Sequence, residues 1–138
     1  MTLLAIEFDW DLLGVAATDA DDRLVLPSAP TGPGLYRLRT ETGPGLPWVH
    51  IGESADLSGR LAAIARPRDG RSADARVNRR LVDALAAGDR VMIWTITEAW
   101  TLVNGGRPVP LDLRRQSNRL LVADAALLAG ASEEGPGS

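Results

Sequence analysis

A tyrosine, a histidine and an arginine in the first half of the chain have types and spacing that suit proton transfer and anion binding. Tyr36 follows Gly34 in one short apolar run, and His50, the single histidine, precedes Gly52 in another. An unperturbed imidazole titrates near pH ~6.5, so His50 could act as a base near neutrality better than a tyrosine, whose pKa is about 10. Arg60 adds a guanidinium, which can bind phosphate with two hydrogen bonds. The alternative for His50 is a structural side chain that donates one hydrogen bond.

Two strands must bring the tyrosine and the histidine together. Residues 35–40 alternate between apolar and basic side chains, as a strand half-covered by core does. A turn at residues 42–45, rich in glycine and proline, predicts a reversal, and residues 48–51 then return as the second strand of a hairpin. We therefore expect Tyr36 and His50 to be neighbours across this hairpin.

A helix after the hairpin must carry the arginine. Ser54 is a plausible N-cap. Arg60 stands at the border of the apolar stripe, so its guanidinium can face back across the sheet. Its alternative partner is Asp56, four residues earlier, in an ordinary helix-surface pair. The apolar stripe itself recurs at helical spacing and predicts packing on the sheet: Leu57, Leu61 and Ile64.

The two half-motifs and the arginine together resemble the GIY-YIG nuclease family. Gly34-Leu35-Tyr36 matches the first half, His50-Ile51-Gly52 matches the second with His50 in place of its tyrosine, and Arg60 stands where the family keeps its catalytic arginine. The resemblance covers about residues 33–130, and the pair with a correctly placed arginine is more specific than either half alone.

The resemblance implies the hydrolysis of DNA phosphodiester bonds with a divalent metal ion, Mg²⁺ or Mn²⁺. Tyr36 would be the base or a water ligand, with His50 sharing the base role, and Arg60 would stabilise the phosphate. The family also holds its metal ion with a glutamate on a later helix. The nearest carboxylate here is Asp124, and an alignment shifted by one residue would put Ala123 there instead.

The residue pattern of the last helix gives Asp124 a second argument. We predict this helix from about Asp112 to Ala129, closed by Gly130. Asp124 falls in the middle of the predicted buried stripe, where an unpaired charge is costly and needs a metal ion, an arginine or strong donors. A metal site and an ion pair inside the fold are equal alternatives. The predicted stripe consists of Leu113, Leu120, Leu121, Leu127 and Leu128.

A cluster of arginines follows the first helix. A basic loop leads into a second helix, predicted from about Ala73 to Ala87 and stopped by Gly88. Such a run is usually a solvated face, but beside a phosphate site it becomes a candidate track for the DNA backbone. The candidate nucleic-acid-binding residues are Arg66, Arg68, Arg71, Arg76, Arg79 and Arg80.

Charge is distributed unevenly along a chain whose net charge is −3. Residues 34–130 carry fourteen arginines against ten acidic residues, a local +4, whereas residues 1–33 carry six acidic residues against Arg23, a local −5. A basic segment favours a nucleic-acid partner. The acidic segment predicts an extra hairpin that covers a sheet edge, with an electrostatic shield against non-cognate DNA as the alternative.

Length and composition limit the remaining choices. The 138 residues predict one domain, without a disulfide framework or thiolate site because cysteine is absent. We see no signal peptide and no run of roughly 18 apolar residues, so we expect a cytoplasmic protein with no membrane partner. We divide the chain into an acidic extension and linker (1–33), a GIY-YIG-like domain (34–130) and a flexible tail (131–138).

The fold we expect is a small α/β domain with a three-stranded, mainly antiparallel sheet flanked by helices, plus an N-terminal acidic hairpin. Residues 91–97 should form the third strand, and residues 98–109 a two-stranded ribbon before the last helix. The function we expect is a metal-dependent DNA endonuclease. The alternatives are a degenerate domain that binds DNA or protein without cleaving it, and an interaction module whose acidic segment binds a basic partner. The chain's small size suggests weak or structure-led recognition of DNA, or a homo-oligomer.

Overall fold

The central element is a four-stranded antiparallel sheet in the order β2–β7–β5–β6. The computed structural model describes residues 1–41 and 47–133. The strands are β2 (Asp11–Val15), β7 (Val91–Ile96), β5 (Gly34–Thr40) and β6 (Val49–Ser54). The three predicted strands are adjacent in this sheet, and the N-terminal segment adds the fourth. The turn predicted at residues 42–45 lies outside the described residues.

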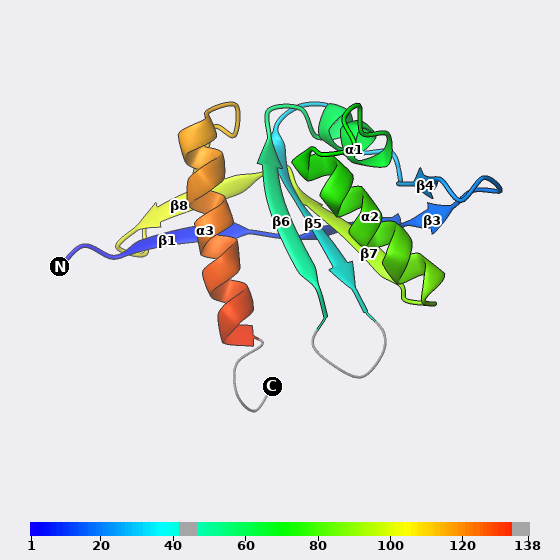
Figure 1. The fold of residues 1–138 in the computed structure, drawn as a ribbon. Coiled ribbons are helices and arrows are strands. Elements are labelled where there is room, and N and C mark those ends of the chain that lie inside the picture. The colour runs from blue at the N-terminus through cyan, green and yellow to red at the C-terminus, as the bar shows by residue number, and fades with distance from the viewer. Residues whose placement is uncertain (42–46, 134–138) are drawn as a thin grey trace.

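Helices cover both faces of the sheet. Side chains alternate between the two faces along β5. Tyr36 and Leu38 lie in a core with α1 (Leu57–Ala65) and α2 (Ala73–Ala86). Leu35 lies in a second core with α3 (Gln116–Glu133). Figure 1 shows α3 on one side of β6 and the green helices α1 and α2 on the other. The predicted α/β class with antiparallel strands and flanking helices is confirmed.

The acidic N-terminal segment is built into the fold as strands. The strand β1 (Leu4–Phe8) pairs with β8 (Ala99–Val103), which also pairs with β9 (Val109–Pro110). The strand β2 covers the edge of β7, and a short hairpin of β3 (Ala17–Thr18) and β4 (Leu24–Val25) follows. The sheet edge is therefore covered by the single strand β2 and not by the predicted hairpin, since β3 and β4 form a separate two-stranded sheet. The predicted ribbon before the last helix is β8–β9.

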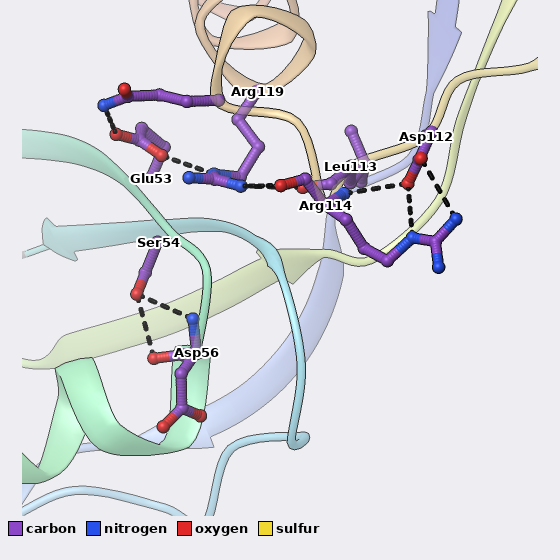
Figure 2. Close-up of polar contacts among 8 residues, drawn as sticks. Glu53, Ser54, Asp56, Asp112, Leu113, Arg114 and Arg119 are labelled. Carbon is purple, nitrogen blue, oxygen red and sulfur yellow. Dashed lines mark hydrogen bonds and ion pairs between the residues drawn. The ribbon is translucent and has the colours of Figure 1, made fainter.

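The helix boundaries test the predicted capping residues. Ser72 caps α2 by accepting the backbone N–H of Ala75 at 3.1 Å, and Gly88 follows its end with φ 88°. The predicted stop at Gly88 is confirmed. The predicted N-cap of α1 is wrong: Asp56 holds that position, and the Ser54 hydroxyl instead bonds the backbone N–H and carbonyl of Asp56 in a tight turn after β6 (Figure 2).

The orientation of α3 differs from the leucine pattern. Arg119 is 6% exposed, and Val122 and Ala126 are also buried. Of the predicted stripe, Leu113 is buried before the helix begins, whereas these four are exposed: Leu120, Leu121, Leu127 and Leu128. The helix begins at Gln116 and continues past Gly130 to Glu133. The leucine stripe was a wrong prediction because a buried ion pair of Arg119, described below, faces the sheet and turns the leucines outward.

Membrane insertion by a helix is not supported by the described part of the chain, where none of the helices is both long and apolar enough to cross a bilayer.

Candidate active site

Tyr36 and His50 meet on the face of the sheet that α1 and α2 cover. In the β5–β6 register Tyr36 lies opposite Gly52 and His50 lies opposite Leu38, so the two side chains meet diagonally. The Tyr36 hydroxyl lies 3.5 Å from Nε2 of His50, and the ring centroids are 5.8 Å apart. Tyr36 and His50 are thus in contact as predicted, but as diagonal neighbours across the two strands and not as directly opposed residues.

Gly52 makes room for the tyrosine. A Cβ atom at this position would lie 2.3 Å from both Cζ and the hydroxyl oxygen of Tyr36. The ring of Tyr36 therefore lies against the β6 backbone, which directs its hydroxyl towards His50. Gly34 has a similar role at the start of β5, because its Cβ would lie 2.3 Å from the Ile96 carbonyl oxygen. Close packing explains why both half-motifs contain glycine.

Arg60 is held by a carboxylate that sequence reasoning did not single out. Its guanidinium donates to Asp74 Oδ1 at 2.8 Å, with the two side chains 40% and 25% exposed. Asp74 lies in the first turn of α2, where the helix dipole favours a negative charge. Asp56, the alternative partner expected from spacing, instead accepts the Ser58 hydroxyl. A guanidinium has five N–H donors, so Arg60 can bind Asp74 and a phosphate together.

The electrostatics of the site favour a protonated tyrosine beside a neutral histidine. Burial raises the pKa of Tyr36; Arg60 opposes this shift, while Asp74 and Glu53 add to it. Burial, followed by the nearby Arg60 charge, lowers the pKa of His50 below 6.5, with Asp74 acting in the opposite direction. At neutral pH, His50 is therefore neutral, and one of its ring nitrogens is available to accept a proton.

Aromatic packing fixes the plane of the histidine ring. Trp48, two residues earlier on the same face, stacks on His50 with ring centroids 5.9 Å apart and planes 6° apart. The Arg80 guanidinium lies 5.7 Å from the centroid of the Trp48 ring. A row of side chains therefore joins the basic side of α2 to Tyr36. The alternation of β6 places Trp48 beside His50, but sequence alone does not reveal the stack.

Asp124 does not join this cluster. It is exposed on the solvent side of α3, beside the exposed leucines, so the prediction that it is buried was wrong. Ala123, from the shifted alignment, is half-buried and has no metal-binding group. Within residues 1–41 and 47–133, no group of three or more His, Cys, Asp and Glu side chains is arranged to hold a metal ion.

A second carboxylate lies behind the site, on the opposite face of the sheet. Glu53 of β6 accepts Nε of the buried Arg119 (Figure 2). It also accepts Nε2 of Gln116 at 3.2 Å. Arg119 also donates to the carbonyl oxygens of Leu113 and Arg114. The Glu53 carboxylate forms an ion pair with Arg119 that attaches α3 to β6. The residues present therefore do not fit the metal site that the family resemblance implies.

All six predicted nucleic-acid-binding arginines have exposed side chains, but they divide by contact. Arg66 and Arg68 line a groove of about 490 Å³ that Asp74 also lines, next to Arg60. Arg76 and Arg79 donate to carbonyl oxygens of the loop between α1 and α2, at Arg71 and Gly70. Arg80 lies over Trp48. The first pair is therefore adjacent to the candidate site, and the second braces the loop.

Comparison with known proteins supports the fold. No protein-family model and no curated protein matches the chain. A solved structure of a mutant of EndoII from bacteriophage T4 is similar, with a TM-score of 0.52 and 14% sequence identity over 67% of this chain and 77% of that chain. At this identity the likeness shows a shared α/β fold.

Proposed function

We propose that this protein is a DNA endonuclease of the GIY-YIG type that hydrolyses phosphodiester bonds. The observation that carries this proposal is the 3.5 Å contact between the Tyr36 hydroxyl and Nε2 of His50, on the face of the sheet where Arg60 also acts on both groups. The fold shared with the bacteriophage T4 EndoII mutant supports the proposal at the level of architecture.

Each side chain has a distinct role in the proposed reaction. Neutral His50 accepts a proton from the attacking water at Nε2, and the Tyr36 hydroxyl orients that water or relays its proton. The water oxygen forms a bond to phosphorus, while the bond from phosphorus to the leaving sugar oxygen breaks. That oxygen keeps the electron pair and takes a proton from solvent. Arg60 stabilises the extra negative charge on the phosphate in the transition state.

DNA as the substrate is supported by the charge beside the site. Arg66 and Arg68 line the groove next to Arg60 together with Asp69 and Asp74, and Arg66 also donates to the Leu24 carbonyl oxygen. Arg80 lies at the other end of the row through Trp48 and His50. Guanidinium groups in such positions can contact successive phosphates of a backbone. Binding should therefore weaken as salt concentration rises.

Cleavage of several forms of DNA tests the proposal. Wild-type protein is incubated with supercoiled plasmid, single strands and branched duplexes, beside Arg60→Ala and the control Arg107→Ala, which removes an exposed arginine in the turn before β9. We expect cleavage by the wild type and the control and loss of cleavage with Arg60→Ala. Salt-dependent binding without cleavage, from folded protein, would instead favour the degenerate DNA-binding module.

A further inference from the structure

The carboxylates that act on the catalytic tyrosine are already paired with arginines. Among the described residues, the carboxylates whose charge raises the pKa of Tyr36 are Asp74 and Glu53. Asp74 accepts a hydrogen bond from Arg60 at 2.8 Å, and Glu53 forms an ion pair with Arg119. Each negative charge is therefore compensated by a guanidinium of the same chain.

Glu53 is poorly suited to ligate a metal ion. Arg119 and Gln116 each bond a different oxygen of its carboxylate, and the Arg119 side chain is only 7% exposed. The guanidinium is fixed by two further bonds, to carbonyl oxygens before α3. A divalent ion at Glu53 would face this buried positive charge, while Mg²⁺ demands a near-octahedral shell of oxygen atoms.

Asp74 is already engaged by the arginine through one of its two oxygens. One of its oxygens takes the Arg60 bond, and the pair lies on the face that Tyr36 and His50 share. A metal ion on Asp74 would stand a few ångströms from the Arg60 guanidinium and repel it. A metal ion at the second oxygen of Asp74 would therefore be disfavoured by the neighbouring positive charge of Arg60.

We propose that the site works without a divalent metal ion, with Arg60, held by Asp74, as the cation at the phosphate. This inference rests on the proposed nuclease function. The water proton goes to Nε2 of His50, the water oxygen bonds to phosphorus, and the leaving oxygen departs with the bonding electron pair and is protonated by solvent. No redox partner or co-reactant is needed. Asp74 is a positioning residue, since it acts through Arg60.

Cleavage in chelator tests the inference directly. Protein and DNA are freed of metal and the initial rate is measured in excess EDTA and in millimolar Mg²⁺ or Mn²⁺. We expect rates that agree within about threefold, a difference of less than 1 kcal/mol in activation free energy. Loss of cleavage in EDTA that Mg²⁺ restores would overturn the inference and leave the nuclease function in place.

Direct metal binding decides the case in which no cleavage is seen. Mn²⁺ is titrated into the wild type while paramagnetic broadening of backbone amide NMR signals near Asp74 and Glu53 is followed, with Asp74→Asn and Glu53→Gln as comparisons. Absence of saturable broadening would show that Asp74 and Glu53 hold no metal ion, which supports this part of the inference independently of cleavage. Saturable broadening that either substitution removes would contradict it.

Discussion

The Tyr36 hydroxyl lies 3.5 Å from Nε2 of His50, a contact made diagonally across β5 and β6 because Tyr36 sits opposite Gly52. Trp48 stacks on the imidazole ring of His50 and fixes its plane. The tyrosine and the histidine therefore form one unit whose protonation is set by burial and by Arg60.

The pH dependence of cleavage should follow the histidine. Burial lowers the pKa of His50 below 6.5, so the neutral base persists into mildly acidic solution, and the rate should fall only at a pH below that value. The pKa of Tyr36 is raised, so its loss of a proton should not limit the rate below pH ~10. Rate profiles of the wild type and Tyr36→Phe check this. An acid limb centred above pH 6.5 would contradict the account.

The lowered pKa of His50 also affects the free energy of unfolding. The unfolded chain binds a proton at His50 near pH ~6.5, while the folded protein resists protonation until the pH is lower. The contribution of His50 to the free energy of unfolding should therefore decrease as the pH falls from about 6.5 towards the folded pKa. Comparing urea unfolding of the wild type and His50→Gln across this range isolates that contribution.

Gly52→Ala should displace Tyr36. A Cβ atom would lie 2.3 Å from the tyrosine Cζ, and overpacking of this kind costs typically about 1–3 kcal/mol. Gly70→Ala is the matched control, because nothing lies within 4 Å of the added Cβ and its backbone does not need glycine. Urea unfolding measures both. If Tyr36→Ala does not reduce the cost of Gly52→Ala in a double-mutant cycle, the clash is not its cause.

The contact between Tyr36 and His50 was predictable because the residue pattern around them encodes local geometry. Glycines at 34 and 52, alternation along β5 and the apolar spacing of α1 are read from neighbouring residues, and together they place Tyr36, His50 and Arg60. Asp74 was missed because it reaches Arg60 from a different helix. Arg60 and Asp74 are fourteen positions apart, and no local sequence pattern predicts their contact.

The last helix shows the limit of counting apolar residues. Its leucines are exposed, and it is instead attached to the sheet through Arg119, which reaches Glu53 sixty-six positions away in sequence. A buried arginine is unusual enough that a helix pattern assigns it to solvent. With Arg119 assigned to solvent, the leucines were assigned to the buried face, and Asp124 among them was wrongly predicted to be buried.

Arg119→Met should be strongly destabilising. It breaks a buried ion pair and leaves the Glu53 carboxylate uncompensated, a change that typically costs about 3–5 kcal/mol. Arg114→Met is the control, because the pair of Arg114 with Asp112 is exposed and should contribute nothing measurable. Thermal and urea unfolding of both variants provide the measurement. Equal stability of the two would mean that the buried pair does not hold α3.

Low pH should weaken the ion pair between Glu53 and Arg119. Burial alone would raise the pKa of Glu53, but the hydrogen bonds from Arg119 and Gln116 outweigh it and lower the pKa. The stabilisation is therefore complete above the unfolded pKa near 4.5 and is lost as the pH falls through the lower folded value. In Glu53→Gln this part of the pH dependence should disappear.

Asp124→Ala should leave both cleavage and stability unchanged. Its side chain is exposed on the far side of α3, and surface substitutions usually change the free energy of unfolding by no more than about 0.5 kcal/mol. Asp74→Asn should instead reduce the cleavage rate by weakening the hold on Arg60, while DNA binding persists. Loss of cleavage in Asp124→Ala with the fold intact would restore that residue as a functional carboxylate.

Chemical rescue of the histidine tests the central claim most directly. Single-turnover cleavage of DNA is measured for the wild type, for His50→Ala and for Arg60→Ala, each with and without free imidazole. We predict that His50→Ala is slower by about 10²–10⁴-fold, that imidazole restores part of its rate, and that Arg60→Ala is not restored. Cleavage by His50→Ala at the wild-type rate would contradict the assignment of His50 as the base.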